Sequence, residues 1–295
     1  MNPDRSNRKA VTRIGAEDFS YLQQLMRKRA GIVLENGKEY LAETRLAALA
    51  IQERYETLGS LLESLYTERE SGDLHRQVIE ALAITETSFF RDLHPFEALK
   101  RSILPERVAG RRPDRCINIW SAACSSGQEP YSIAMIIREL FPQLLGGGVR
   151  VIASDISQRM LGRARAGRFT QIEVNRGLPA PLLVKYFSEI GHDWQVRDEL
   201  RRMIEFREFN LAGGWPPLPP MDVILLRNVL LYLDVDVRRA VLRQVARVMR
   251  PDGYLLLGGG ETTLTLDEAY EPVQFGKTVC YRLTESARAR MKKAA

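Results

Sequence analysis

From residue 94 onward, short apolar stretches alternate with segments of helical periodicity, and this alternation limits the possible folds more than any other feature of the sequence. Strand-like stretches lie at residues 116–120, 149–153, 204–209, 222–226 and 254–257, and helical ones at 130–141, 158–166 and 236–249. Repeated strand–helix units imply a doubly wound α/β fold, in which helices cover both faces of a mostly parallel sheet. Residues 273–275 and 278–283 flank Gly276 and Lys277 and predict a closing antiparallel hairpin.

The segment before this alternation has a different pattern. Apolar residues between Asp18 and Ala83 recur at helical spacing, which predicts an all-α N-terminal domain over residues 14–84. The sheet domain then covers residues 85–284. Within it, the stretch at 167–203 is longer than a single crossover needs, so we expect an inserted subdomain there.

The charge of the chain is concentrated at its ends. Lys and Arg number 43 against 37 Asp and Glu, a formal net charge of +6. Residues 1–13 contribute +3 and residues 282–295 contribute +4, which leaves −1 for the rest. We therefore predict basic tails at 1–13 and 285–295. A nearly neutral body offers no broad phosphate-binding face, which argues against a nucleic-acid partner.

Other patterns bear on location and metal content. No apolar run approaches the roughly 18–20 residues that span a bilayer, and the N-terminal segment lacks the apolar core of a signal peptide, so we expect no membrane insertion. The three cysteines form no Cys-x-x-Cys pair, which favours a reducing cytoplasm. The three histidines are scattered without ligand spacing and predict no metal site.

The loop after the first predicted strand, residues 121–130, is rich in small residues and falls at the carboxyl edge, where open α/β sheets bind ligands. It contains Gly127 but no Gly-x-Gly-x-x-Gly, and Glu129 stands at the start of the next helix. An acid there repels phosphate and suits a cation or a hydroxyl. S-adenosylmethionine has no phosphate and carries an ammonium and a sulfonium. Alternatively, Glu129 only stabilises the first helical turn through the helix dipole.

Polar residues also follow the other strands and the link between the domains. Asp155 ends the second strand and is placed either to accept both ribose hydroxyls or to cap the next helix. Asn210 follows the third strand, and Arg227 and Asn228 follow the fourth, although Asn228 could instead cap a turn. Arg91 comes after two phenylalanines, and a guanidinium in that setting can hold a carboxylate with two hydrogen bonds.

Together these motifs resemble those of the chemotaxis receptor glutamate O-methyltransferases, the CheR family. The resemblance lies in Thr-Glu-Thr-Ser-Phe-Phe-Arg at 85–91, Trp-Ser-Ala-Ala-Cys-Ser-Ser-Gly-Gln-Glu-Pro-Tyr-Ser-Ile-Ala at 120–134, Ala-Ser-Asp-Ile at 153–156, Phe-Asn-Leu at 209–211 and Leu-Arg-Asn-Val-Leu-Leu-Tyr at 226–232. It implies a methyltransferase sheet with a terminal hairpin and a small inserted β subdomain, behind a receptor-facing helical domain. It also implies an enzyme that uses S-adenosylmethionine to methylate glutamates on the cytoplasmic helices of chemoreceptors, releasing S-adenosylhomocysteine.

The resemblance further implies a set of site residues. Those expected to line the cofactor site are Thr85, Thr87, Arg91, Glu129, Asp155, Asn210, Leu211, Arg227 and Asn228. Arg91 and Tyr232 are expected near the transferred methyl group, with Arg91 orienting the acceptor and Tyr232 bounding the methyl. A glutamate side chain, with a pKa of about 4.3, is already ionised at pH 7 and needs no general base.

The sequence departs from the family at two places. Thr85 stands where some members have Asn. Some members also grip a tether peptide at the receptor C-terminus through a Gly-rich loop of the β subdomain, whereas the stretch at 186–194 is short and contains only Gly191. We therefore expect an enzyme that does not depend on the tether. Separately, we expect it to be a monomer.

Three questions stay open at this stage. A basic strip on the helical domain is either a docking face for an acidic receptor helix or a solvated face with interleaved glutamates; it comprises Arg27, Lys28, Arg29, Lys38, Arg45 and Arg54. The acceptor could instead be a non-receptor protein or a small carboxylate. The chain could also be a signalling adaptor that binds the cofactor without turnover.

Overall fold

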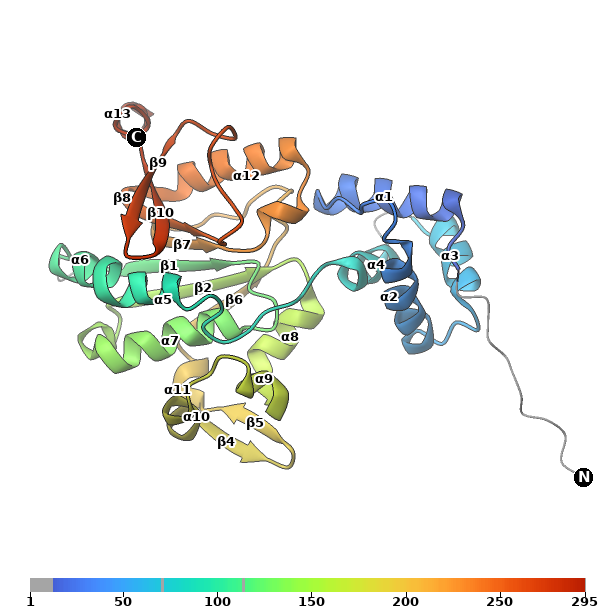
Figure 1. Cartoon of the computed structure of the whole chain (residues 1–295), viewed down its shortest axis with the longest axis horizontal. Coiled ribbons are helices and arrows are strands. Elements are labelled where there is room, and N and C mark those ends of the chain that lie inside the picture. Colours follow the sequence, from blue (N-terminus) through green and yellow to red (C-terminus); the bar gives the residue numbers. More distant parts are fainter. Residues whose placement is uncertain (1–12, 70–71, 113–114, 295) are drawn as a thin grey trace, which may run out of the picture. The chain divides into compact units, whose positions relative to one another are not determined.

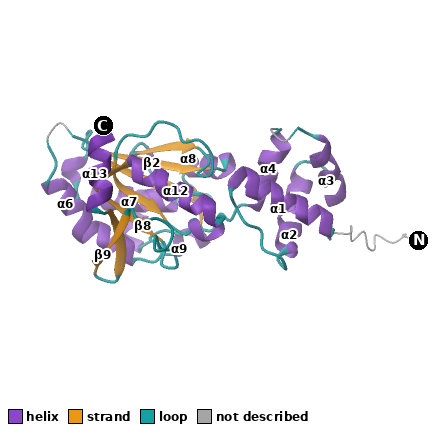
Figure 2. Ribbon diagram, turned by 90° about the horizontal axis from the view of Figure 1, so that it is seen from above, coloured by secondary structure: helices purple, strands orange, loops and turns teal. Residues whose placement is uncertain are grey.

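The computed structural model describes residues 13–69, 72–112 and 115–294. The chain divides into two compact units, with the boundary between Ile84 and Thr85. Within the described residues of the first unit, the helices are α1 (Ala16–Ala30), α2 (Glu39–Gln52), α3 (Leu58–Thr67) and α4 (Asp73–Leu82), drawn in purple in Figure 2. Leu22, Met26, Leu46, Leu61 and Leu65 are fully buried, so the apolar periodicity of the sequence corresponds to the core of this unit.

Local signals set the ends of these helices. Helix α1 ends at Gly31, whose φ of 68° is left-handed and suits glycine. Helix α3 begins with a capping box between Thr57 and Ser60. On α4, His75 is 1% exposed and lies within 3.0 Å of the Tyr21 hydroxyl and 3.3 Å of the Glu68 carboxylate, so it is a hydrogen-bonded core histidine.

The second unit is built on a mixed sheet. Its described strands, in spatial order β6-β2-β1-β7-β8-β10-β9 (Figure 1), are β6 (Ile204–Glu208), β2 (Val149–Asp155), β1 (Ile117–Ala122), β7 (Met221–Leu226), β8 (Met249–Leu257), β10 (Thr278–Leu283) and β9 (Tyr270–Phe275). The first five run parallel, and β10 is antiparallel to both of its neighbours. The doubly wound sheet with a closing hairpin is therefore confirmed.

Helices cover both faces of this sheet. Those of the second unit outside the insertion are α5 (His94–Ala98), the π-helix η1 (Leu99–Ile103), α6 (Leu104–Ala109), α7 (Gln128–Leu140), η2 (Pro142–Leu144), α8 (Gln158–Ala166), η3 (Leu230–Tyr232), α12 (Val235–Val248) and α13 (Glu285–Ala294). Figure 1 shows α7 and α12 on the two sides of the strands, as right-handed crossovers in opposite directions require. Within the segment that we predict to be a basic C-terminal tail, residues 285–294 form α13.

The inserted segment forms a small antiparallel subdomain. It contains β3 (Arg168–Thr170), α9 (Gln171–Asn175), α10 (Ala180–Tyr186), β4 (Phe187–Ile190), β5 (Asp193–Val196) and α11 (Asp198–Arg201). The strand order is β3-β5-β4, and Figure 1 places β4 and β5 beyond α7 from the main sheet. Phe89 packs edge-on against Phe169 and Phe187, with ring centroids 5.0 and 5.7 Å apart, so the segment before α5 is anchored to the subdomain.

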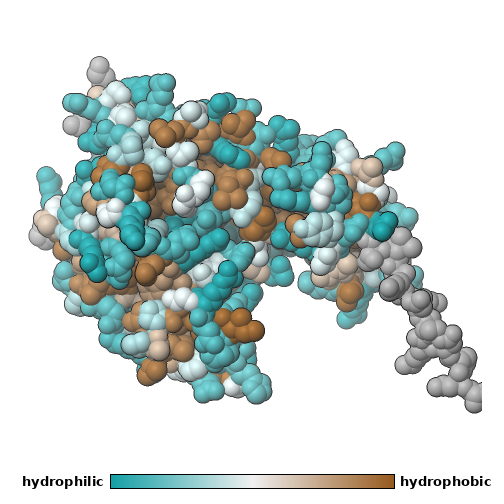
Figure 3. Space-filling model, viewed as in Figure 1, coloured by the Kyte–Doolittle hydropathy of each residue, from teal (hydrophilic) through white to brown (hydrophobic). Residues whose placement is uncertain are grey.

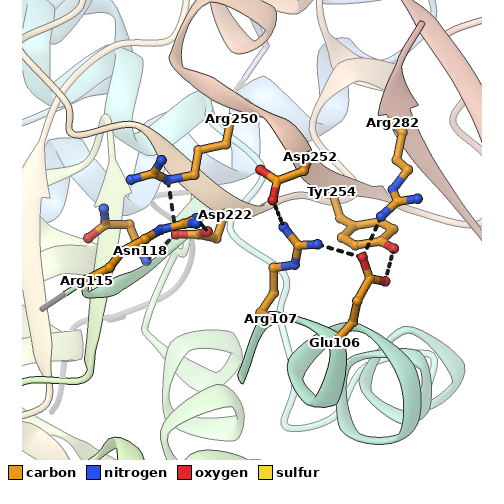
Figure 4. Close-up of polar contacts among 9 residues, drawn as sticks. All are labelled: Glu106, Arg107, Arg115, Asn118, Asp222, Arg250, Asp252, Tyr254 and Arg282. Atoms are coloured by element: carbon orange, nitrogen blue, oxygen red, sulfur yellow. Dashed lines mark hydrogen bonds and ion pairs between the residues drawn. The ribbon is translucent and has the colours of Figure 1, made fainter. Parts of the chain in front are cut away.

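A network of ion pairs lies at the amino ends of the strands (Figure 4). Asp222, near the start of β7, is 1% exposed; it pairs with Arg115 and Arg250 and accepts the Asn118 backbone N–H at 2.9 Å. Glu106 on α6 accepts from Tyr254, Arg107 and Arg282, and Arg107 also pairs with Asp252. These contacts tie α6 to the sheet at the edge opposite to the carboxyl ends of the parallel strands.

The hydropathy of the helices can be compared with what a membrane-spanning element requires. The face in Figure 3 is mostly hydrophilic, with scattered hydrophobic residues. Across the described ranges, no helix has both the length and the apolar character that crossing a bilayer requires.

Candidate active site

The parallel strands bring the predicted site residues to one edge of the sheet. In the register of β1 with β2, Ala122 lies opposite Ser154, so the loop after β1 starts beside the end of β2. Asp155 is the last residue of β2, and Arg227 directly follows β7. The strand alternation alone therefore predicts that these polar groups face one another across neighbouring loops.

Asp155 holds the loop after β1. Its two carboxylate oxygens accept the backbone N–H groups of Ser125 at 2.8 Å and Ser157 at 2.9 Å. Ser157, and not Asp155, caps α8, because its hydroxyl accepts the N–H of Met160 at 3.1 Å. The capping alternative for Asp155 is therefore wrong. Each carboxylate oxygen can accept more than one hydrogen bond, so ribose hydroxyls are compatible with these contacts.

The loop itself has an unusual backbone. Ala123, Ser125 and Gly127 have positive φ angles of 55°, 49° and 95°. A Cβ on Gly127 would lie 2.9 Å from the Cβ of Ala164 on α8, so only glycine allows this approach. The hydroxyl of Ser125 donates to the carbonyl of Thr85 at 2.6 Å, which fixes the start of the 85–91 segment against the loop.

Glu129 and Arg227 form the most buried ion pair of the site. Glu129 accepts from the Ser121 hydroxyl at 2.8 Å and from Nη1 of Arg227 at 2.9 Å. Nη2 of Arg227 donates to the Arg91 carbonyl at 2.7 Å and to Asp92 at 2.8 Å. The side chain of Arg227 is 2% exposed, and its guanidinium lies 5.4 Å from the centre of the Phe96 ring. Glu129 therefore does more than stabilise the first turn of α7.

The backbone around Arg91 is strained. Phe90, Asp92 and Leu93 all have positive φ, at 47°, 66° and 43°, and such conformations persist only where surrounding contacts enforce them. Here the contacts are the two bonds from Arg227 and one from the Phe90 N–H to the Ser132 hydroxyl, at 3.0 Å. The result is a rigid segment that presents Arg91 at the carboxyl edge.

The side chain of Arg91 makes one contact inside its own segment. Its Nη1 donates to the Glu86 carbonyl at 2.8 Å, which engages one of the five donors of the guanidinium. The Glu86 carboxylate pairs with Arg176 at 2.5 Å, and this hydrogen bond lowers the pKa of Glu86. The segment is thus held from the loop after β1, from Arg227 and from the subdomain.

Asn210 and Leu211 follow β6 and form a tight turn. The side-chain oxygen of Asn210 accepts the N–H of Ala212 at 2.9 Å, and the carbonyl of Leu211 accepts the indole N–H of Trp215 at 3.0 Å. The Phe209 N–H donates to the Asp155 carbonyl at 3.1 Å, which brings this turn beside Asp155. Tyr232 lies on η3, five residues after Arg227, and is half-buried.

One residue of this edge escapes prediction from the sequence. Glu261, in the connection after β8, accepts hydrogen bonds from the backbone of the 228–231 segment and of Gly258. Asn228 has a positive φ of 58°, and its N–H is one of those donors. The available signal was three glycines followed by an acid directly after a parallel strand.

The predicted residues Thr85 and Thr87 line a cavity of about 320 Å³. Ser126 from the loop after β1, Gln128 from the start of α7 and Met160 from α8 line it as well. Charged side chains complete much of the lining, namely Glu86, Arg159, Arg163, Glu173 and Arg176. The site residue Glu129 directly follows Gln128 on α7, and Asp155 ends β2.

These groups suit S-adenosylmethionine better than a dinucleotide. An anionic Glu129 at the start of α7 opposes a phosphate there and favours an ammonium group. Asp155 offers acceptors for hydroxyls at the position where ribose binds in such sheets. In the described parts of the chain, no group of three or more His, Cys, Asp or Glu side chains is arranged to hold a metal ion.

The fold and this edge define the class of the protein as an S-adenosylmethionine-dependent methyltransferase. The SAM-binding domain of the CheR methyltransferases matches residues 85–279, and their all-alpha domain matches residues 17–83. The chain therefore belongs to the CheR family of chemotaxis protein methyltransferases, and it is an enzyme of that kind.

Similar full-length relatives agree with this assignment. Chemotaxis protein methyltransferase 1 of Pseudomonas aeruginosa is 39% identical over 90% of this chain and 97% of its own length. Chemotaxis protein methyltransferase Cher2 of Pseudomonas putida is 36% identical over 91% of this chain and 98% of its own. Chemotaxis protein methyltransferase 1 of Vibrio cholerae is 37% identical over 93% and 99%.

Proposed function

We propose that this enzyme methylates glutamate side chains on the cytoplasmic helices of methyl-accepting chemotaxis receptors and produces glutamate methyl esters. It acts in the cytoplasm as a monomer and does not need a receptor C-terminal tether. The observation that carries this proposal is the frame around Arg227, which fixes the backbone of Arg91 beside Glu129 at the carboxyl edge. This frame supports the proposal because it holds the Arg91 backbone at the edge from which an acceptor carboxylate would approach.

Different residues of the carboxyl edge bind different groups of the cofactor. Glu129 accepts the ammonium group of S-adenosylmethionine, and Asp155 accepts the ribose hydroxyls. Asn210, Leu211 and Asn228, with Thr85 and Thr87, line the remainder of the cofactor site. Arg227 is buried among Glu129, Asp92 and the Arg91 carbonyl, so it acts by positioning these groups. When bound, the cofactor supplies an electrophilic methyl group.

The acceptor side of the reaction needs alignment rather than proton transfer. A glutamate carboxylate is ionised at pH 7. Arg91 orients it, and Tyr232 bounds the space for the methyl group. Well-oriented reacting pairs gain roughly 7–11 kcal/mol. Because the carboxylate loses its charge as the ester forms, an Arg that gripped it too tightly would favour substrate over transition state. Arg91, at an open edge, can orient the carboxylate without binding it too tightly.

Methylation of receptors tests the proposal directly. The full chain is incubated with radiolabelled S-adenosylmethionine and receptors from the same genome, and base-labile methyl esters are counted. We expect Arg91→Ala to lower the rate at least tenfold. Arg101→Ala, which removes an arginine that is 82% exposed, should leave it unchanged. Equal rates in both variants would exclude the role of Arg91, and label on another protein or on a small acid would exclude the receptor as substrate. Tight cofactor binding without any transfer would indicate a non-catalytic adaptor.

Independence from the tether rests on the subdomain. Its β4–β5 hairpin turns through only two residues, Gly191 and His192. A loop of that length leaves little backbone to grip a peptide. Receptors with and without their last residues should therefore be methylated at rates within twofold of each other. A loss of methylation on truncation would refute this part of the proposal, and a sedimentation experiment tests the monomer.

The helical unit is the proposed receptor-facing domain. Arg27, Lys28 and Arg29 are exposed at the end of α1, and Arg54 is exposed after α2. Arg45 is different, because it donates to the carbonyls of residues 82 and 83 and so closes the end of α4. Charge reversal at Lys28 and Arg54 should slow methylation and flatten its salt dependence. Unchanged methylation kinetics would show that these basic residues form a solvated face that does not dock the receptor.

A further inference from the structure

We propose that Glu261 is a positioning residue of the methyl-transfer site. Its carboxylate lies between two loops of the carboxyl edge, the one after β7 and the one after β8. Through backbone hydrogen bonds it fixes residues 228–231, which include the predicted site residue Asn228 and directly precede Tyr232. This inference rests on the proposed function, since it assigns Asn228 to the cofactor and Tyr232 to the methyl group.

Four backbone N–H groups converge on this one carboxylate. Oε2 accepts from Asn228 at 2.7 Å and from Gly258 at 2.7 Å. Oε1 accepts from Val229 at 2.7 Å and from Leu231 at 3.3 Å. Bonds from N–H groups to an ionised acceptor are about twice as strong as neutral ones. The carboxylate therefore holds the connection between β7 and η3 (Leu230–Tyr232) by charge-assisted bonds.

The turn after β8 brings the Glu261 carboxylate close to Asn228. The Glu261 N–H donates to the Gly258 carbonyl at 2.9 Å and closes a tight turn directly after β8. A Cβ on Gly258 would lie 2.7 Å from the side-chain nitrogen of Asn228 and 2.8 Å from Oε2 of Glu261, so glycine lets the two loops meet. Asn228 holds a left-handed φ of 58°, which the bond from its N–H to Glu261 helps to fix.

An amide cannot replace the carboxylate here. Glutamine has one acceptor oxygen and one donor group, whereas both oxygens of Glu261 face backbone donors. In either orientation, Glu261→Gln loses two of the four bonds and turns an NH₂ toward two N–H groups. Glu261→Asp keeps both acceptors and the charge but is one methylene shorter, so it should recover part of the geometry.

The test compares Glu261→Gln with two control variants in the full chain. Glu268→Gln makes the same chemical change at an exposed position of the same connection. Asp222→Asn weakens a buried ion pair at the opposite edge and controls for a general loss of stability. At a temperature where all variants are folded, S-adenosylhomocysteine affinity is measured by calorimetry, and kcat and KM are measured on receptor.

We expect Glu261→Gln to lower kcat at least tenfold and to weaken S-adenosylhomocysteine binding at least threefold, with Glu261→Asp in between. Both controls should stay within twofold of the wild type. The proposal is overturned if Glu261→Gln also stays within twofold. If Glu261→Gln does not fold, Glu261→Asp decides. Because its shorter side chain cannot keep all four bonds, wild-type values of both kcat and S-adenosylhomocysteine affinity in Glu261→Asp would overturn the proposal. If the wild type itself methylates no receptor, the proposed function fails, while the calorimetry still tests whether Glu261 positions Asn228.

Discussion

The buried fork of Arg227 allows a quantitative prediction for Arg227→Lys, which keeps the charge but not the geometry. In the native protein, Nη1 of Arg227 donates a hydrogen bond to Glu129, while Nη2 donates to the Arg91 carbonyl and to Asp92. A single ammonium cannot span both sides, so the lysine keeps Glu129 and loses the Arg91 segment, or the reverse.

The size of the effect follows from the burial of each partner. A hydrogen bond to a charged group contributes about 1.5–3 kcal/mol, and the lost bond to the Arg91 carbonyl is of this kind. The lost pair with Asp92 contributes at most about 1 kcal/mol, because the Asp92 side chain is 48% exposed. We therefore expect Arg227→Lys to lower the free energy of unfolding by about 1.5–4 kcal/mol.

The chain offers a selective probe for this measurement. All three tryptophans, Trp120, Trp194 and Trp215, lie in the second unit, so tryptophan fluorescence in urea follows the unfolding of that unit alone. Receptor methylation by the folded variant should fall at least tenfold, since Arg91 loses its anchor. Arg101→Lys, at a site that is 82% exposed, should change neither quantity. A change in unfolding free energy below about 0.5 kcal/mol, the usual range for surface substitutions, would refute the argument. So would normal methylation by a destabilised Arg227→Lys.

Three further predictions concern the second unit. Gly127→Ala should destabilise this unit by more than about 1 kcal/mol, because alanine is strained at a positive φ. Its methyl group would also lie 2.9 Å from the Cβ of Ala164, which should disturb the loop and weaken S-adenosylhomocysteine binding. Gly162→Ala, with nothing within 4 Å, should instead stabilise α8, and the opposite order in urea melts would contradict both. Burial raises the pKa of the Cys280 thiol to about 12 from 9.0, so the folded state keeps its proton while the unfolded state ionises above pH 9. The stabilisation is complete below pH 9 and is lost at about 1.4 kcal/mol per pH unit toward pH 12, so Cys280→Ala should show a shallower decline, and parallel curves would exclude this cause. Asp222→Asn should lower the melting temperature of the second unit without changing kcat, and a slower enzyme would show that the amino edge affects the site.

The sequence predicted the arrangement of strands and helices well, because each parallel strand is a compact apolar run followed by small or polar residues. Strand β1 spans Ile117–Ala122 where we predict 116–120, and α7 begins at Gln128 where we predict residue 130. Strand ends also located Asp155, Asn210 and Arg227, since their positions follow from the alternation itself.

Contacts between distant residues were beyond this reasoning. The bonds of Glu261 to residues 228, 229 and 231 span 30 to 33 positions, and the segment from 258 to 269 has no periodicity that would mark an acceptor. Ser157 as the cap of α8 could only be separated from Asp155 by geometry. The π-helix η1 precedes Pro105, which lacks a backbone N–H and cannot continue a regular α-helical ladder, and sequence periodicity does not reveal where such a bulge falls.

Arg227 and Glu261 each hold one strained part of the carboxyl edge. Positive φ angles at non-glycine residues cost about 1–3 kcal/mol each. Some lie elsewhere in the described chain, as at Ala123 and Ser125, but four lie in the 90–93 segment and at Asn228. Each of these places is bonded to one buried or half-buried ion, Arg227 for the first and Glu261 for the second. Charge-assisted bonds of the kind they make are strong enough to offset such strain. The irregular backbone around Arg91 and at Asn228 is therefore kept in one conformation by two ions, without support from a longer helix or strand.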